Sequence, residues 1–283
     1  MSEVQTEKMP SPNTEEFVAI EVKPNTFKAI VMAILLLLWI PFGVLSMLVC
    51  RLLKLKATYK FPLLFHGVVC RMFGMQCQYY GEVASQRPTM YVANHVSYLD
   101  VFVLGSILPG AFVAKSEVSG WPLFGKLAKL QNTLFLERRS SRAAGQIEQV
   151  RNHLQEESNV IVFPEGTSTA GNYVARFKST LFQSAQGMQI QPVSVVYSHY
   201  KGQPMQQSQR DHYAWYLPDP KLQPPVPNKP FAAHFFAALG LGSSTVQVVL
   251  HPPINMPEGA RKEVALACEE QVRSGLSQYL ERS

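Results

Sequence analysis

The chain carries one long apolar run near its start, followed by a shorter one. Residues 29–50 contain no charged side chain, and about 20 apolar residues suffice to span a bilayer as a helix. We therefore predict a membrane helix here; a buried helix of a soluble protein is the alternative. Pro41 and Gly43 leave open a kink or a re-entrant hairpin. The second run, residues 61–75, is too short to span, which predicts a helix that lies in the membrane interface or packs against the first.

From about residue 88 onward, short apolar runs alternate with stretches of helical period. Strands are predicted at residues 90–93, 111–114, 133–136, 160–163, 192–197 and 246–250. Helices are predicted at residues 141–156 and 258–281, where apolar side chains recur every three or four positions. Strands that alternate with helices indicate an α/β fold with a mixed sheet flanked by helices. Residues 203–230, rich in Pro and Gln, predict a long loop, and residues 231–241 a short apolar helix that touches lipid.

These patterns divide the chain into three parts. We predict a disordered tail at residues 1–26, membrane-anchoring helices at residues 27–80 and a globular domain at residues 81–283. Four basic residues without an acidic one follow the long apolar run, namely Arg51, Lys54, Lys56 and Lys60. Because positive charge collects on the cytoplasmic side of membranes, the globular domain is expected in the cytoplasm.

Composition supports contact with lipid. Charged residues make up only 16% of the chain, against about 25% in typical soluble proteins. The net charge of +6 suits an anionic membrane surface or an anionic substrate. No basic patch is interleaved with aromatic residues, so nucleic-acid binding is not predicted. The four cysteines form no CxxC pair, which favours a reducing compartment over a disulfide framework.

A histidine and a carboxylate follow the strand predicted at residues 90–93. The segment 94–100 reads Asn-His-Val-Ser-Tyr-Leu-Asp, and it places Asp100 five residues after His95. A carboxylate at that spacing can fix the tautomer of the imidazole, so that His95 acts as a general base. The alternative is a loop histidine beside an aspartate that starts a helix, and the spacing alone does not separate the two.

Two further segments end predicted strands. Residues 163–167 read Phe-Pro-Glu-Gly-Thr, in which Gly166 allows a tight turn and Thr167 can donate a hydrogen bond to an oxyanion. Residues 134–139 read Leu-Phe-Leu-Glu-Arg-Arg, and the guanidinium of Arg138 suits a phosphate group. Taken singly, these are an ordinary strand-to-helix turn and a solvated arginine pair.

Taken together, the three segments resemble the glycerolipid acyltransferase family, best known from 1-acylglycerol-3-phosphate acyltransferases. That family carries NHxxxxD, then GxxFxxR, then FPEGTRS, then a strand with a buried proline. Residues 94–100, 135–138 and 163–167 match the first three blocks, and Gln191-Pro192-Val193 stands where the fourth is expected. Residues 112–117 and 165–169 also resemble the branch of bacterial lyso-ornithine lipid acyltransferases. The likeness extends over about residues 60–200, and it makes residues 81–283 the acyltransferase domain.

The resemblance implies a mechanism and its partners. His95, oriented by Asp100, would take the proton from a lysolipid hydroxyl as that hydroxyl attacks the thioester of acyl-CoA or acyl-carrier protein. The acceptor head group would be held by Arg138, Glu165, Gly166, Thr167 and Lys178. No cofactor or metal ion is implied beyond the acyl donor. The expected location is the bacterial inner membrane, with the catalytic domain on the cytoplasmic side.

The chain departs from the family pattern at two positions that bear on the acceptor. Asn132 replaces a glycine, and Ser168 replaces the arginine of FPEGTRS. The missing arginine removes a positive charge from the acceptor pocket. Lysophosphatidic acid, which would give phosphatidic acid, is the first expectation from the motifs, and lyso-ornithine lipid is the alternative.

Three other classes of function fit the sequence less well. A serine hydrolase needs a Gly-x-Ser-x-Gly elbow, and the sequence has none. Residues 120–126 imitate the start of a phosphate-binding loop, but Leu127 stands where the magnesium ligand belongs. A lipid-binding membrane protein that has lost activity remains an alternative, although His95, Asp100 and Glu165 are all intact.

Overall fold

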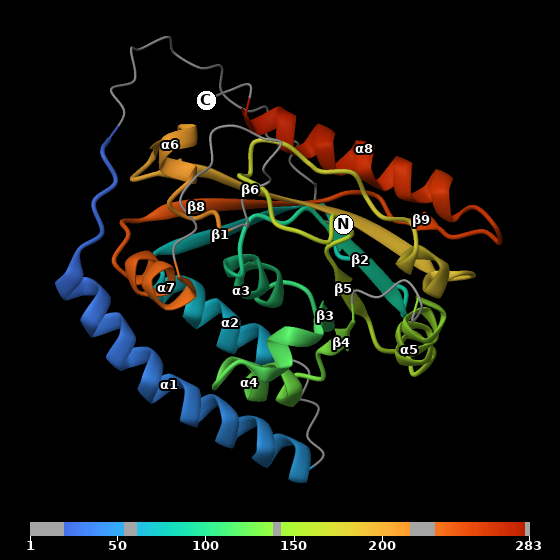
Figure 1. Ribbon diagram of the computed structural model, residues 1–283, viewed down its shortest axis with the longest axis horizontal. Coiled ribbons are helices and arrows are strands. Elements are labelled where there is room, and N and C mark those ends of the chain that lie inside the picture. Colours follow the sequence, from blue (N-terminus) through green and yellow to red (C-terminus); the bar gives the residue numbers. More distant parts are fainter. Residues whose placement is uncertain (1–19, 54–60, 138–142, 216–229, 281–283) are drawn as a thin grey trace, which may run out of the picture.

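The computed structural model describes residues 20–53, 61–137, 143–215 and 230–280. A single mixed sheet forms the centre, with the strand order β1-β8-β6-β2-β5-β3-β4, while β7 and β9 pair with β6 (Figure 1). The strands are β1 Met75–Tyr80, β2 Thr89–Ala93, β3 Ala111–Lys115, β4 Leu134–Leu136, β5 Val160–Val162, β6 Gln189–Tyr200, β7 Gln203–Pro204, β8 Ser244–Leu250 and β9 Ile254–Asn255. The predicted α/β fold with a mixed sheet flanked by helices is therefore confirmed.

Helices cover both faces of this sheet. They are α1 Thr26–Leu52, α2 Phe61–Met72, α3 Leu99–Gly105, α4 Phe124–Leu130, α5 Ala143–Gln155, α6 Gln207–Arg210, α7 Phe231–Leu239 and α8 Arg261–Leu280, with 3₁₀ turns η2 Ser116–Gly120 and η4 Leu181–Ala185. One apolar core joins α1, α2, α3 and α7 to the sheet, and a second joins α5 and α8 to the opposite face.

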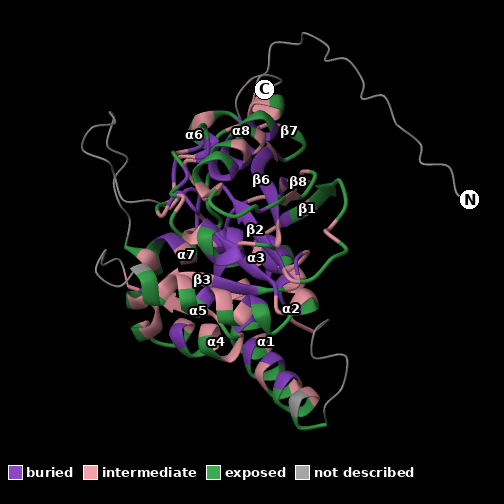
Figure 2. Ribbon diagram, turned by 90° about the vertical axis from the view of Figure 1, so that its right-hand side faces the viewer, coloured by how far each residue is buried: buried purple, intermediate pink, exposed green. Residues whose placement is uncertain are grey.

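The central strands are buried on both faces (Figure 2). Every residue of β2 and β5 is buried, and both strands are continuous apolar or β-branched runs. Such runs suit parallel strands that are covered by helices on both sides. Since β2 runs parallel to β5 and to β6, the carboxyl ends of β2 and β5 meet at one edge of the sheet.

The first apolar run forms one uninterrupted helix. α1 passes through Pro41 without a break, so the structure shows neither the re-entrant hairpin nor an end at this proline. Of the described helices, α1 alone is long and apolar enough to cross a membrane, a criterion that rests on length and composition. Its outer face exposes large side chains, including Leu38 at 68% and Leu45 at 62%.

The second apolar run forms α2, which packs against α1. This packing was one of the two alternatives predicted for the segment. The rings of Trp39 in α1 and Phe65 in α2 stack with their centroids 6.0 Å apart. A side chain at Gly43 would meet the Phe65 ring at 2.6 Å, so glycine is what permits this close approach. α2 also packs against α3.

Two local predictions need correction. Residues 75–80 fall within the predicted helical segment 27–80, but they form β1, which pairs in parallel with β8. Residues 203–210 fall within the predicted loop, but they form β7 and the short helix α6. Residues 216–229 of that loop and residues 1–19 of the predicted disordered tail lie outside the described residues. The division into three parts itself stays a prediction.

Candidate active site

The loop that follows β2 is tied to the neighbouring strand β6. The Asn94 side chain donates to the carbonyl of Val195 at 2.9 Å and accepts from the Val195 amide at 2.8 Å. Asn94 is fully buried, so this two-way bond satisfies its amide and fixes the direction in which the chain leaves the strand. The next residue, His95, therefore emerges at a set position at the carboxyl edge of the sheet.

His95 and Asp100 form the pair that their spacing predicted. The Nδ1 atom of His95 lies 2.8 Å from Oδ2 of Asp100. The same oxygen accepts the backbone amides of Val96 at 2.7 Å and Ser97 at 2.9 Å. The Asp100 side chain is fully buried, whereas that of His95 is 22% exposed. The carboxylate thus folds the loop and orients the imidazole, which leaves Nε2, on the opposite edge of the ring, for a substrate proton.

A fourth contact to the Asp100 carboxylate comes from Tyr197, which sequence reasoning missed. The Tyr197 hydroxyl donates to Oδ1 of Asp100 at 2.8 Å, from a buried position in β6. Burial, together with the negative charge of Asp100, raises the pKa of Tyr197 well above its usual value, so the phenol remains a donor. The available signal was a tyrosine within a predicted buried strand, because a buried phenol normally requires a polar partner.

Phe163 forms the wall behind the imidazole. Its ring stacks on that of His95 with a centroid distance of 4.0 Å and an interplanar angle of 19°. Phe163 directly follows β5, and β5 is the parallel neighbour of β2. The two segments that were singled out in the sequence therefore meet at one edge of the sheet.

Glu165 supports the backbone of His95. Its Oε1 accepts the His95 amide at 2.6 Å and its Oε2 accepts the Ala175 amide at 2.7 Å. Burial raises the pKa of Glu165 to about 8, while the two backbone hydrogen bonds act in the opposite direction. We predicted a contact between Glu165 and the acceptor head group; each of its oxygens accepts one backbone amide, and the contact with the head group stays a prediction.

The turn at residues 163–169 also holds the other side of His95. The carbonyl of His95 accepts the Thr169 amide at 2.8 Å. Both backbone groups of His95 are thus bonded to this turn, since its amide reaches Glu165. A displacement of the turn would move the imidazole with it.

The remaining predicted site residues lie at or near the same turn, with one exception. Gly166 has a φ of +69°, and a side chain there would meet the Lys178 ammonium at 2.6 Å, so Lys178 lies directly over Gly166. Thr167 and Lys178 are both exposed. Arg138 lies outside the described residues, two positions beyond the end of β4. Within the described ranges, no three His, Cys, Asp or Glu side chains gather in a way that could hold a metal ion.

Ser168, where the family pattern has arginine, makes a contact of its own. Its hydroxyl donates to the carbonyl of Trp215 at 2.7 Å. The amide of Trp215 in turn donates to the carbonyl of Val96, beside His95, at 3.1 Å. At this position the chain therefore has a neutral link between the turn and the loop that carries His95, in place of a positive charge.

Comparisons with known proteins give the same assignment as the motifs. A family model described as Acyltransferase matches residues 76–198. The lyso-ornithine lipid O-acyltransferase of Rhizobium meliloti is 34% identical over 244 residues, which cover 82% of this chain and 80% of that protein. The 1-acyl-sn-glycerol-3-phosphate acyltransferase of Neisseria meningitidis is 36% identical over 123 residues, which cover 42% of this chain and 48% of that protein.

A solved structure shares the fold. The crystal structure of the 1-acyl-sn-glycerophosphate acyltransferase PlsC from Thermotoga maritima matches with a TM-score of 0.64 over 89% of this chain and 93% of that chain, at 22% sequence identity. At this identity the likeness is one of fold. Family membership is shown by the matched family model together with the long alignment with the Rhizobium relative. The chain belongs to the acyltransferase family.

Proposed function

We propose that the chain is a lyso-ornithine lipid O-acyltransferase, which moves a fatty acyl group from a thioester onto the free hydroxyl of that lysolipid. The observation that carries this proposal is the length of the alignments. Similarity to the Rhizobium relative extends over 82% of this chain, whereas similarity to the Neisseria relative extends over 42%. Lysophosphatidic acid, the acceptor that the motifs favour, is thus supported less than the alternative.

The proposed reaction starts at the exposed edge of the imidazole. Nε2 of His95 takes the proton of the acceptor hydroxyl, whose oxygen attacks the thioester carbonyl. The carbon–oxygen bond forms, the carbon–sulfur bond breaks, and the imidazolium returns its proton to the departing thiolate. Asp100 stabilises the imidazolium through the 2.8 Å bond to Nδ1. A general base of this kind contributes about 10²–10⁴-fold to the rate.

The head group would be received at the turn beside His95. Thr167 and Lys178 are exposed there, and the ammonium of Lys178 suits the carboxylate of an ornithine head group. Arg138 and Gly166 also belong to this proposed head-group site. Ser168 provides no charge, since its hydroxyl bonds to Trp215. A phosphate would thereby lose a charge-assisted hydrogen bond worth about 1.5–3 kcal/mol, which favours an acceptor without phosphate.

Acceptor preference tests this assignment. We expect kcat/KM for lyso-ornithine lipid to exceed that for lysophosphatidic acid at least about tenfold, a difference of about 1.4 kcal/mol. Ser168→Arg should lower acylation of lyso-ornithine lipid, because a new charge enters the site and the bond to Trp215 is lost. A wild-type preference for lysophosphatidic acid, together with a gain from Ser168→Arg, would establish the other acceptor.

We also propose that α1 lies in one leaflet of the bacterial inner membrane with both of its ends on the cytoplasmic side. The segment before α1 packs on the globular domain, because Val22 is buried there and Gln209 of α6 donates to the carbonyl of Ile20 at 2.7 Å. The Asn25 amide donates to the Gly240 carbonyl, after α7, at 2.9 Å. The helix that follows α1, α2, packs on the same domain. A helix that crossed the bilayer would carry its two ends to opposite sides.

Labelling of single cysteines tests this topology. Glu21→Cys, before α1, and Glu258→Cys, in the globular domain, place thiols at exposed positions. Both should resist an impermeant thiol reagent in intact cells and react once the cells are opened. The unsubstituted chain measures the background from the four native cysteines. Labelling of Glu21→Cys alone in intact cells would mean that α1 crosses the membrane.

A further inference from the structure

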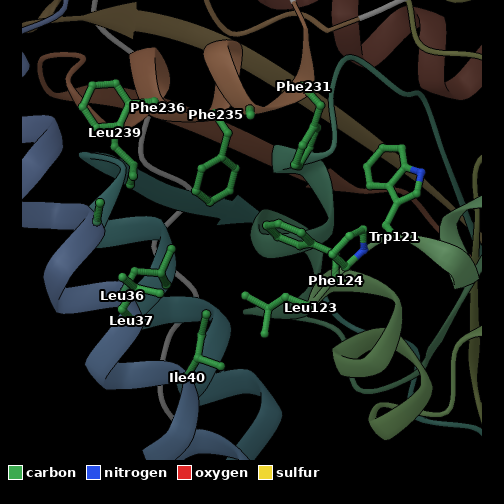
Figure 3. Close-up of a pocket in the computed structure, with 13 residues that line it drawn as sticks. Leu36, Leu37, Ile40, Trp121, Leu123, Phe124, Phe231, Phe235, Phe236 and Leu239 are labelled. Carbon is green, nitrogen blue, oxygen red and sulfur yellow. The ribbon is translucent and has the colours of Figure 1, made fainter.

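A groove of about 400 Å³ lies between α1, α7 and residues 121–124, which lead into α4 (Figure 3). Each of these three segments contributes apolar side chains, namely Leu37 and Ile40, Phe231 and Phe235, and Trp121 and Phe124. The volume falls within the range of ligand pockets in proteins. α1 and α7 both lie outside residues 76–198, the part of the chain that the family model matches.

The lining defines the chemistry of the occupant. Among the residues that the structure describes, no charged side chain lines the groove, and the surface that they form there is almost wholly hydrocarbon. A charged head group placed there would lose its hydration without gaining a partner. The groove therefore suits a hydrocarbon chain.

One end of the groove borders the loop that carries His95. The ring of Phe231 lies 4.8 Å from that of Tyr98, three residues beyond His95. The Tyr98 hydroxyl also bonds to Nδ1 of His234 in α7 at 2.9 Å. α7 thus forms a wall of the groove and contacts the loop that carries the proposed base.

The groove is also continuous with the surface that we assign to the membrane. Leu37 lines the groove and is 64% exposed, and Phe236 lines it and is 39% exposed. Leu38, the neighbour of Leu37, stands on the apolar outer face of α1 at 68% exposure. A lipid in the leaflet around α1 could therefore move its chain sideways into the groove without passing through water.

We infer that this groove binds the hydrocarbon chain of the lysolipid acceptor and so aligns its hydroxyl with His95. This inference rests on the proposed function. The acceptor is a membrane lipid and meets the groove along α1, whereas the donor thioester is carried by a polar group in the cytoplasm. Because the acceptor chain leaves one apolar medium for another, the groove should affect the orientation and chain-length preference of the acceptor more than its overall partitioning.

Two neighbouring alanines of α7 provide a matched pair of variants. Ala232 lines the groove and Ala233 does not, and both are exposed. Ala232→Phe should fill the groove and lower kcat/KM for a long-chain lyso-ornithine lipid at least tenfold, while it spares a short-chain one. Ala233→Phe should leave both values unchanged. For either variant, the dependence on donor chain length, measured at saturating acceptor, should match that of the unsubstituted protein.

Other outcomes would overturn the inference. A changed donor profile with an unchanged acceptor profile would assign the groove to the donor chain, and no change in either would remove it as a substrate site. A readout that does not depend on turnover is photolabelling of the full-length membrane protein with a lyso-ornithine lipid that carries a diazirine in its chain. Labelled peptides should come from α1, α7 and residues 121–124. Labelling of these peptides without any acyl transfer would reject the proposed function but support the groove as a binding site. Acyl transfer with labelling of other peptides would support the proposed function but reject the groove.

Discussion

His95→Ala is expected to lower kcat at least about 100-fold, because it removes the proposed general base. The fold should survive this change. The imidazole is partly exposed, and Asp100 keeps its hydrogen bonds from Val96, Ser97 and Tyr197. The measurement is the steady-state rate of thiol release from the donor, with the melting temperature and membrane association of the variant determined alongside.

A surface histidine supplies the control for this variant. His153→Ala removes a half-buried imidazole from α5, which packs in the core on the other face of the sheet from α3, so its kcat should equal that of the unsubstituted chain. Near-native turnover by His95→Ala would eliminate His95 as the base. An equal loss in both variants would point to a general effect on the preparation.

The second large effect is expected from Glu165→Gln, in both stability and rate. Each carboxylate oxygen accepts a backbone amide, and an amide side chain can satisfy only one of them. The other becomes a buried donor without a partner, which costs about 1–3 kcal/mol in free energy of unfolding. Because the turn holds His95, kcat should also fall; a misplacement of about 1 Å can cost roughly 10²-fold. Denaturant unfolding and steady-state kinetics measure the two effects, at a pH of about 9 where Glu165, with its pKa of about 8, is ionised.

Glu269→Ala separates loss of stability from loss of position. Glu269 in α8 is a buried carboxylate that accepts the amide of Phe177 and forms an ion pair with Arg273. Its replacement leaves the buried Phe177 amide without this acceptor, so it should destabilise the fold to a similar degree and leave kcat unchanged, since Glu269 does not touch His95. Equal losses of kcat in the two variants would show that Glu165 acts only through stability.

The strands of the sheet centre were predictable because they are short, continuous apolar runs. β2, β3, β5, β6 and β8 all overlap predicted strands. β1 was not, because its sequence Met-Gln-Cys-Gln-Tyr-Tyr mixes polar and apolar residues and only Met75 is buried. It forms at the edge of the sheet by pairing with β8, from a segment more than 160 positions later in the chain.

The short helix α6 shows where local patterns give no signal. Residues 203–210 have no apolar period, and the helix depends on tertiary contacts. The guanidinium of Arg210 is buried and donates to the carbonyls of Tyr197 and Met205. Arginine side chains are seldom fully buried, so the sequence predicted a loop here.

The contacts of the candidate site also fall into two groups, those between neighbours in the sequence and those between distant positions. The contact between His95 and Asp100 was predictable because both residues lie in one loop, five positions apart. The contact of Tyr197 with Asp100 and the support of His95 by Glu165 were not, since they join positions 97 and 70 residues apart. They require the order of β2, β5 and β6 in the sheet, which hydrophobic patterns do not specify.

Transfer of an acyl group onto a lysolipid hydroxyl, and binding of lipid without chemistry, are distinguished by the products that form. The most direct measurement follows purified protein in defined vesicles with an acyl thioester and lyso-ornithine lipid, and compares free thiol with ester product by mass spectrometry. We predict thiol and ester in equal amounts, both absent when the acceptor is omitted and both strongly reduced in His95→Ala. Thiol release without ester would indicate a thioesterase, and no release above background would show that the chain is not an acyltransferase for this acceptor.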